Sequence, residues 1–320
     1  MATDTLEQKH TDDHSTDNAS WDGGVYPFKV GYGKLMIWYF LLSDAFTFAG
    51  FLISYGTLRF SMPTWPVPDF VFSLFPFLEG HHPLLFVTFM TFVLLFSSFT
   101  MIRAVQEGHR ENRRGVIIWM FLTILGGLSF LGCQAWEWTT LIGREHMSVT
   151  TNPFGTHTEA GIYLGPDGKE STETFKAHTS YIMHRIDFTA APAEGAEHAA
   201  EGGEHGGHAY SAPGDYPDAT VDERGYVHRK YLVSEGENAG KVKTDAFGPK
   251  AFGALFFFIT GFHGFHVFSG VLFLTTILVN VASGIYVARH NRNEMVEKIG
   301  LYWHFVDLVW VFVFLVFYLL

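Results

Sequence analysis

Long apolar stretches alternate with polar loops along most of the chain. A helix rises about 1.5 Å per residue, so about 20 mainly apolar residues are needed to cross the hydrocarbon core of a membrane. Five stretches reach this length: residues 35–58, 83–102, 115–142, 251–288 and 299–320. The pattern predicts an all-α membrane protein built as a bundle of five transmembrane helices. We expect an extramembrane insertion between the third and fourth helices.

The same pattern divides the chain into four parts. They are a polar extension (1–34), the first three helices (35–142), the insertion (143–250) and the last two helices (251–320). Within the insertion, β-forming clusters at 181–188 and 225–233 and a Gly-Pro-Asp-Gly turn at 165–168 predict a few short strands. The acidic start of the chain lacks the basic segment and apolar core of a secretory signal, so we expect no cleaved signal peptide.

Basic residues in the short loops predict the orientation. The loop 103–114 carries four arginines and the loop 289–298 carries two arginines and a lysine, whereas the loop 59–82 carries Arg59 alone. The excess of positive charge places the two basic loops in the cytoplasm. We therefore expect a cytoplasmic amino terminus, with the insertion and the carboxyl terminus on the periplasmic side of a bacterial inner membrane.

Composition narrows the class of protein. Hydrophobic residues make up 48% of the chain and charged residues 17%, a balance that excludes an ordinary soluble domain. The net charge of −11 resides mainly in the polar segments, and no basic stripe with interleaved aromatics is present, so we expect no nucleic acid partner. The single cysteine, Cys133, lies in the third predicted span, where we expect a small buried residue rather than a disulfide or a zinc ligand.

Six ionisable groups interrupt the predicted spans. They are Asp44, Glu137, His263, His266, His304 and Asp307. A charge near the centre of a bilayer costs at least about 2.5 kcal/mol, so these side chains should face protein rather than lipid. The two histidines of the fourth span are three residues apart, as are His304 and Asp307, so each pair shares one face of its helix.

The depths of these groups predict their partners. Counting about 1.5 Å per residue from the middle of each span places both aspartates and His304 about 4–8 Å to the inner side, and Glu137 and the other histidines about 5–13 Å to the outer side. Because the groups spread along the bundle, we interpret them as hydrogen-bonded polar ties rather than ligands of a haem or metal. We predict that Glu137 pairs with His263 and that Asp44 pairs with His304, with Asp307 as the second candidate. A proton relay within the chain is the remaining alternative.

A low-complexity segment, residues 190–215, lies within the insertion. His198, His205 and His208 alternate there with glutamates in a chain rich in Ala and Gly. Imidazole and carboxylate groups suit Zn or Cu, so a metal-buffering segment is one interpretation. We favour a solvated linker, because a Gly-rich chain loses much conformational entropy in forming a defined site.

Five motifs together resemble subunit III of the haem-copper terminal oxidases. They are Leu42-Ser-Asp-Ala-Phe46, Leu94-Leu-Phe-Ser-Ser98, Gln134-Ala-Trp-Glu-Trp138, Thr260-Gly-Phe-His-Gly-Phe-His-Val-Phe-Ser-Gly270 and Trp303-His-Phe-Val-Asp-Leu-Val-Trp310. Their order and spacing match across all five predicted spans. The polar extension and most of the insertion lie outside the resemblance.

The resemblance implies an accessory subunit with no catalytic residue, haem or copper of its own. Oxygen is reduced to water in subunit I of this family, and haem and copper are expected in the partner subunits, which include subunit I and subunit II. Subunit III packs on subunit I near its proton-uptake entrance and stabilises it during turnover. Seven residues fall on the family's recurrent polar positions and form the expected polar network of the proton pathway: Asp44, Glu137, His263, His266, Glu297, His304 and Asp307.

The chain departs from the family in two ways. Mitochondrial-type members have two further helices ahead of these five, with phospholipid in the cleft between the two groups, where this chain has only its polar extension. This departure counts against the family's lipid site, although phospholipid stays a candidate ligand. Asp44 stands where cytochrome c oxidases generally have Glu, and Ser43-Asp44 resembles the quinol-oxidase branch. The stretches 134–137 and 302–304 look more like the cytochrome c branch. We expect a cytochrome c oxidase, with a quinol oxidase as the alternative.

Two other classes of protein remain as alternatives. One is a freestanding haem-binding redox protein, and the other is a transporter with Asp44 and Asp307 as a proton relay. Transporters often contain internal repeats with broken helices, which this sequence lacks.

The acidic insertion lies on the side where a c-type cytochrome would dock, so we expect it to contact that donor or another respiratory complex. Membrane lipids complete the expected partners.

Overall fold

A computed structural model describes residues 32–76, 82–165, 168–185, 220–284 and 294–319. Most of the polar extension and the whole low-complexity segment with His198, His205 and His208 lie outside the described residues. The predictions made for those two segments therefore stay predictions.

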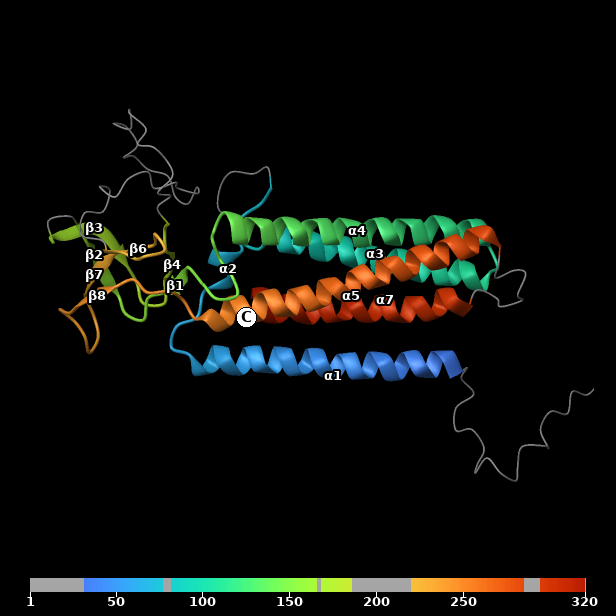
Figure 1. The fold of residues 1–320 in the computed structure, drawn as a ribbon, viewed down its shortest axis with the longest axis horizontal. Helices are drawn as coiled ribbons and strands as arrows, with labels where there is room; N and C mark the ends of the chain where they lie inside the picture. The colour runs from blue at the N-terminus through green and yellow to red at the C-terminus, as the bar shows by residue number, and fades with distance from the viewer. Residues whose placement is uncertain (1–31, 77–81, 166–167, 186–219, 285–293, 320) are drawn as a thin grey trace, which may run out of the picture.

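Five long helices run side by side (Figure 1). They are α1 (Tyr32–Ser61), α3 (Leu85–His109), α4 (Arg113–Gly143), α5 (Lys250–Ser283) and α7 (Glu294–Phe314), which a π-helical turn, η1 (Leu315–Leu319), continues. Each is long and apolar enough to cross a membrane, so the predicted five-helix membrane bundle is confirmed. A short helix, α2 (Pro68–Val71), lies between α1 and α3.

The predicted fourth span was too long. Helix α5 stops at Ser283, since Gly284 adopts the left-handed conformation that ends helices, with φ of 79°.

Small side chains let α3 and α4 pack closely. The Thr100 and Thr123 hydroxyls lie 2.8 Å apart across this interface, and the indole of Trp303 on α7 donates a hydrogen bond of 2.9 Å to the Ser97 hydroxyl. A Cβ added at Gly126 would lie 2.6 Å from the Ser97 Cβ. Glycine is therefore required at 126, because any side chain there would push the two helices apart.

Helix α1 lies at the edge of the bundle (Figure 1). Its buried residues, Leu41, Phe48 and Tyr55, are seven positions apart and form one narrow stripe. Large apolar side chains such as Trp38 and Phe46 are exposed on the rest of its surface. In a membrane this surface contacts lipid or another membrane helix.

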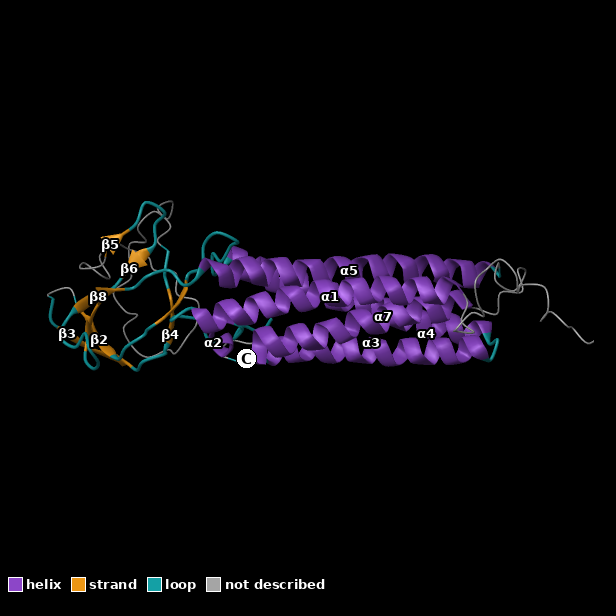
Figure 2. Cartoon of the chain, turned by 90° about the horizontal axis from the view of Figure 1, so that it is seen from below, coloured by secondary structure: helices purple, strands orange, loops and turns teal. Residues whose placement is uncertain are grey.

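The insertion folds into short antiparallel strands beyond one end of the helices (Figure 2). The strands are β1 (Phe154–Thr156), β2 (Gly161–Leu164), β3 (Glu170–Phe175), β4 (Ser180–Ile182), β5 (Thr220–Val221), β6 (Val227–His228), β7 (Lys230–Val233) and β8 (Val242–Thr244). A four-stranded sheet has the order β3-β2-β7-β8, and two-stranded ribbons pair β1 with β4 and β5 with β6. The β-forming clusters that the sequence indicated contain β6, β7 and most of β4, although β4 ends at Ile182, well short of the predicted 188.

The strands share a core with the helices. Phe154 and Met147 are buried in the same apolar cluster as the helix side chains. The Asn152 side chain donates to the Pro249 carbonyl at 3.0 Å, immediately before α5. A Cβ at Gly248 would lie 1.8 Å from the Phe154 carbonyl oxygen, so only glycine fits this crossing. The insertion is thereby fixed to the end of the bundle rather than attached by a loose linker.

Candidate functional site

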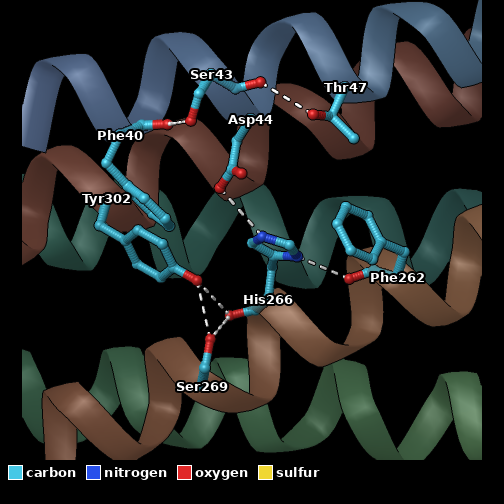
Figure 3. Close-up of polar contacts among 8 residues, drawn as sticks. All are labelled: Phe40, Ser43, Asp44, Thr47, Phe262, His266, Ser269 and Tyr302. Atoms are coloured by element: carbon cyan, nitrogen blue, oxygen red, sulfur yellow. Dashed lines mark hydrogen bonds and ion pairs between the residues drawn. The ribbon is translucent and has the colours of Figure 1, made fainter.

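An aspartate and a histidine from two helices meet in the bundle (Figure 3). Asp44 Oδ2 on α1 lies 3.1 Å from His266 Nε2 on α5, and the two side chains are 14% and 9% exposed. The other ring nitrogen, Nδ1, lies 2.8 Å from the Phe262 carbonyl oxygen. That oxygen can only accept a hydrogen bond, so His266 Nδ1 must carry a proton.

The tautomer of His266 determines what the pair can hold. With its proton on Nδ1, a neutral imidazole presents a lone pair at Nε2, which binds Asp44 only if Asp44 is protonated. Otherwise an imidazolium donates from Nε2 to the Asp44 carboxylate. Whichever residue carries it, a hydrogen bond between Asp44 and His266 Nε2 requires one proton between the two side chains. The geometry therefore makes Asp44 and His266 a single proton-holding unit inside the bundle.

Hydroxyl groups from α5 and α7 meet at the backbone carbonyl of His266 (Figure 3). The Tyr302 hydroxyl donates to the His266 carbonyl oxygen at 3.1 Å and lies 2.9 Å from the Ser269 hydroxyl, which reaches the same carbonyl at 2.9 Å. The Phe48 ring packs edge-on against the His266 ring, with centroids 5.5 Å apart. Three helices thus fix the position of one histidine.

The predicted partner of Asp44 was wrong. The sequence favoured His304 or Asp307, whereas the structure places His266 against Asp44. The fourth helix is shorter than predicted, so its middle lies near His266, and the depth of this histidine matches that of Asp44 more closely. His304 instead faces α3, where its Nδ1 lies 2.7 Å from the Ser98 hydroxyl.

The predicted pair of Glu137 and His263 was also wrong. Glu137 on α4 accepts hydrogen bonds from the Gln134 amide at 3.0 Å and from the Tyr318 hydroxyl at 3.2 Å. It therefore connects α4 to η1 at the end of the chain. Sequence reasoning did not single out Tyr318, and its only signal was a polar group in an otherwise apolar carboxyl-terminal run.

His263 and Asp307 are both buried inside the bundle. In the described part of the chain, neither ring nitrogen of His263 and neither carboxyl oxygen of Asp307 has a hydrogen-bond partner. The His263 ring packs between Phe130 and Trp310, with centroid distances of 5.7 and 5.2 Å. The interpretation as a hydrogen-bonded tie was therefore wrong for His263, which is an aromatic packing residue, whereas the Asp307 carboxyl lies close enough to the Ser98 side chain for a polar interaction.

Glu297 lies at the end of the bundle opposite the strands. Its carboxylate forms an ion pair of 2.8 Å with Lys34, so it joins the start of α7 to the start of α1. Sequence reasoning placed Glu297 in the polar network but did not identify Lys34. The ion pair is partly exposed, so its contribution to stability is small.

The seven predicted site residues do not form one site. Among them, only Asp44 and His266 are joined by a direct hydrogen bond. Among the residues that the structure describes, no three His, Cys, Asp or Glu side chains are arranged to hold a metal ion. The chemistry that the arrangement supports is therefore proton holding at Asp44 and His266, with the other groups joining or packing helices.

Comparisons with known proteins match subunit 3 of two kinds of oxidase. A family model described as cytochrome c oxidase subunit III matches residues 242–320. Quinol oxidase subunit 3 of Bacillus subtilis (strain 168) is 28% identical over 163 residues, which cover 47% of this chain and 73% of that protein. Cytochrome c oxidase subunit 3 of Marchantia polymorpha is 42% identical over 93 residues, or 29% of each chain. The same subunit of Schizophyllum commune is 48% identical over 93 residues, again 29% of each chain.

Proposed function

The chain belongs to the subunit III family of the haem-copper oxidases, and from that premise we propose that it serves in a cytochrome c oxidase as an accessory subunit of aerobic respiration. In this proposal it packs on subunit I near the proton-uptake entrance and stabilises subunit I during turnover. It contributes no redox centre or catalytic residue, and haem and copper reside in the partner subunits.

The observation that carries the proposal is the Asp44–His266 unit. Its hydrogen bond joins α5 to α1, which is the least buried of the five candidate spans. An apolar helix surface of this kind is suited to contact with another membrane subunit. A proton held directly behind that surface can adjust the local charge near a proton entrance without acting as an obligatory carrier.

The electron donor is the part of the proposal with a specific alternative. Cytochrome c oxidase relatives share the higher identity over shorter stretches, whereas the quinol oxidase relative is similar over a longer stretch. Ser43-Asp44 also supports the quinol alternative, while the stretches 134–137 and 302–304 support cytochrome c. We favour cytochrome c because the acidic insertion suits a cationic donor.

The insertion is the proposed docking element for that donor. The basic loops support placing the strand end of the bundle on the periplasmic side of a bacterial inner membrane. Glu235 and Glu237 are exposed in the loop between β7 and β8. Replacing both with Gln should raise KM for reduced cytochrome c at low salt and reduce the salt dependence of the rate, while replacing Lys169 and Lys176 with Gln should not raise KM. An unchanged salt dependence would contradict docking at this loop.

The stabilising role can be tested by removing and restoring the chain. An oxidase prepared without this chain should begin oxygen reduction at a near-normal rate and then lose activity sooner during sustained turnover. Adding back the full chain should restore the lifetime. An oxidase that never starts without the chain, or one that lasts equally long without it, would contradict the proposal.

A further inference from the structure

A pocket of about 460 Å³ lies where α4 ends and the insertion begins. Its polar lining includes Arg185, Arg224, His146, Ser148 and Thr151. Its apolar lining includes Ile142, the residue before the last one of α4. The pocket thus joins a basic, hydroxyl-rich wall to the end of a membrane helix.

The two arginines are held in place by uncharged groups. Arg224 Nη1 donates to the Thr151 hydroxyl at 3.3 Å, and Arg185 Nε donates to the Arg224 carbonyl at 3.1 Å. The Arg185 guanidinium also lies over the Tyr226 ring, 5.9 Å from its centroid. Within the described residues, neither arginine has a carboxylate at ion-pair distance. Two oriented positive charges therefore face the pocket without a counterion from the described part of the chain.

The two acidic residues that precede Arg224 in the sequence are directed elsewhere. Asp222 Oδ1 accepts hydrogen bonds from the backbone N–H groups of Arg224 and Tyr226 at 2.9 and 2.8 Å, and its other oxygen lies 3.8 Å from His228. Asp222 and Glu223 line an adjoining groove rather than this pocket. Among the described residues that line the pocket, none is acidic.

The lipid-facing surface of α4 leads directly to the pocket. Exposed apolar residues recur along one face of the helix at Ile118, Phe121, Leu125 and Leu128. Positions 132, 135, 139 and 142 continue this face with helical spacing, and all four are exposed. An acyl chain lying along this face would end at Ile142, which is 49% exposed, with its phosphate level with the arginines.

We propose that this pocket binds the phosphate headgroup of an anionic membrane phospholipid whose acyl chains lie along α4. Guanidinium groups bind phosphate oxygens through paired, charge-assisted hydrogen bonds, and the hydroxyls of Ser148 and Thr151 can donate to the same oxygens. Continuity with the apolar face of α4 selects a lipid over a soluble phosphate. The site uses α4 and the insertion and does not involve α1.

Photolabelling of the full chain in its oxidase complex tests the proposal. The complex is placed in phosphatidylcholine nanodiscs that contain phosphatidylglycerol with a photoactivatable group near the phosphate, and labelled peptides are identified by mass spectrometry. We expect labelling in the peptide that contains residues 142–151. The double substitution R185Q/R224Q should reduce that labelling about tenfold, equivalent to about 1.4 kcal/mol of binding. R185K/R224K, which keeps the charge, should retain more of it than the glutamine variant.

Three controls distinguish a lipid site from a soluble-anion site and from a general effect of charge. The substitution K169Q/K176Q makes the same change of charge elsewhere in the insertion and should leave labelling unchanged. Excess inorganic phosphate at constant ionic strength should not compete, and competition would overturn the lipid assignment in favour of a soluble anion. Equal labelling by a photoactivatable phosphatidylcholine would overturn selectivity for anionic lipid. If R185Q/R224Q fails to assemble, labelling of the wild-type complex that resists high salt would contradict the charged contact.

Discussion

Asp44 and His266 lie 3.1 Å apart across α1 and α5, with the second ring nitrogen of His266 bound to a backbone carbonyl. Because that carbonyl fixes the tautomer, the unit holds one proton whichever residue carries it. The unit offers the most specific chemistry inside the bundle, and two of the predictions below follow from it.

The first prediction concerns Asp44→Asn. An asparagine amide can donate to the neutral His266 Nε2, so helix contacts should survive, while the proton shared by the pair is lost. We expect near-normal initial oxygen reduction and an earlier loss of activity during sustained turnover. Following oxygen consumption to exhaustion at several pH values measures both. Complete loss of initial activity would make Asp44 an essential carrier, and traces identical to wild type would make it a packed acid without a role in turnover.

The second prediction concerns the strength of the pair. His266→Phe leaves the Asp44 carboxyl without its partner, whereas Asp44→Leu with His266→Phe removes both polar groups. Leaving one buried polar group unsatisfied costs about 1–3 kcal/mol, so the single His266→Phe variant should be less stable than the double variant. Thermal unfolding of the complex checks this order. If the stability losses of Asp44→Leu alone and His266→Phe alone add up to that of the double variant, the two residues are not coupled.

A third prediction separates Glu137 from His263. Glu137→Leu leaves the Tyr318 hydroxyl and the Gln134 amide without their acceptor, so it should destabilise the complex by about 1–3 kcal/mol for each unsatisfied group. His263→Phe serves as the control, because its ring packs between aromatics and makes no hydrogen bond to the described residues. It should change stability little. Equal destabilisation by both substitutions would instead support the direct Glu137–His263 pair that depth alone suggested.

The core of the strand domain carries a pH-dependent group. Asp245 is 5% exposed, and its Oδ2 accepts a hydrogen bond of 3.4 Å from the Tyr163 hydroxyl, which lies 3.0 Å from His157 Nε2. Burial raises the pKa of Asp245 from 3.8 to about 7, opposed by the nearby charge of Arg229 and by the Tyr163 hydrogen bond. Burial also lowers the pKa of His157 from 6.5 to about 4.

These pKa shifts predict that pH has opposite effects on the stability that Asp245 and His157 contribute. The folded domain binds the Asp245 proton more tightly than the unfolded chain, so stability from this residue falls as pH rises from about 4 to 7. His157 is neutral in the folded domain, whereas the unfolded chain gains a proton there. Its contribution to stability is therefore lost as pH falls from 6.5 to about 4. Asp245→Asn keeps His157 and removes only the carboxylate. It should therefore stabilise the domain relative to wild type at about pH 8 and have little effect at about pH 4.

Hydrogen exchange in peptides that contain β2 and β7 measures this difference in the full chain. Comparing variant and wild type at the same pH cancels the intrinsic pH dependence of exchange. Faster exchange of Asp245→Asn at about pH 8 would show that attraction between Arg229 and the carboxylate outweighs the cost of burial.

The positions of the five helices could be predicted from the sequence because hydropathy reports directly on length and burial. The partners of the buried polar groups could not. Depth along a helix says nothing about the direction in which a side chain points, and this direction separates His304, which faces Ser98, from His266, which faces Asp44. The left-handed Gly284 also shifted the middle of α5, on which the depth of His266 depended.

The strand domain was predictable only in part. Gly165 and Gly168 of the predicted turn lie in the connection between β2 and β3 and are joined by a backbone hydrogen bond of 2.9 Å, while residues 166–167 lie outside the described residues. The connection between β7 and β8 contains Gly236 and Gly240, whose φ values of 104° and 84° favour glycine, yet no turn dipeptide marks them. The pocket beside α4 lies between residues far apart in sequence, such as Ile142 and Arg224, so no local pattern indicated it.

We propose that this chain is an accessory subunit of a haem-copper oxidase that oxidises cytochrome c. Affinity purification of the chain in mild detergent, followed by a haem spectrum and oxygen consumption with reduced cytochrome c and with a quinol, tests it most directly. We expect a one-to-one complex with a haem-carrying subunit, oxygen consumption driven by cytochrome c, and no Soret band once this chain is separated from its partners. A chain that purifies without such a subunit, or that keeps a stoichiometric haem of its own, would contradict a role as an accessory subunit.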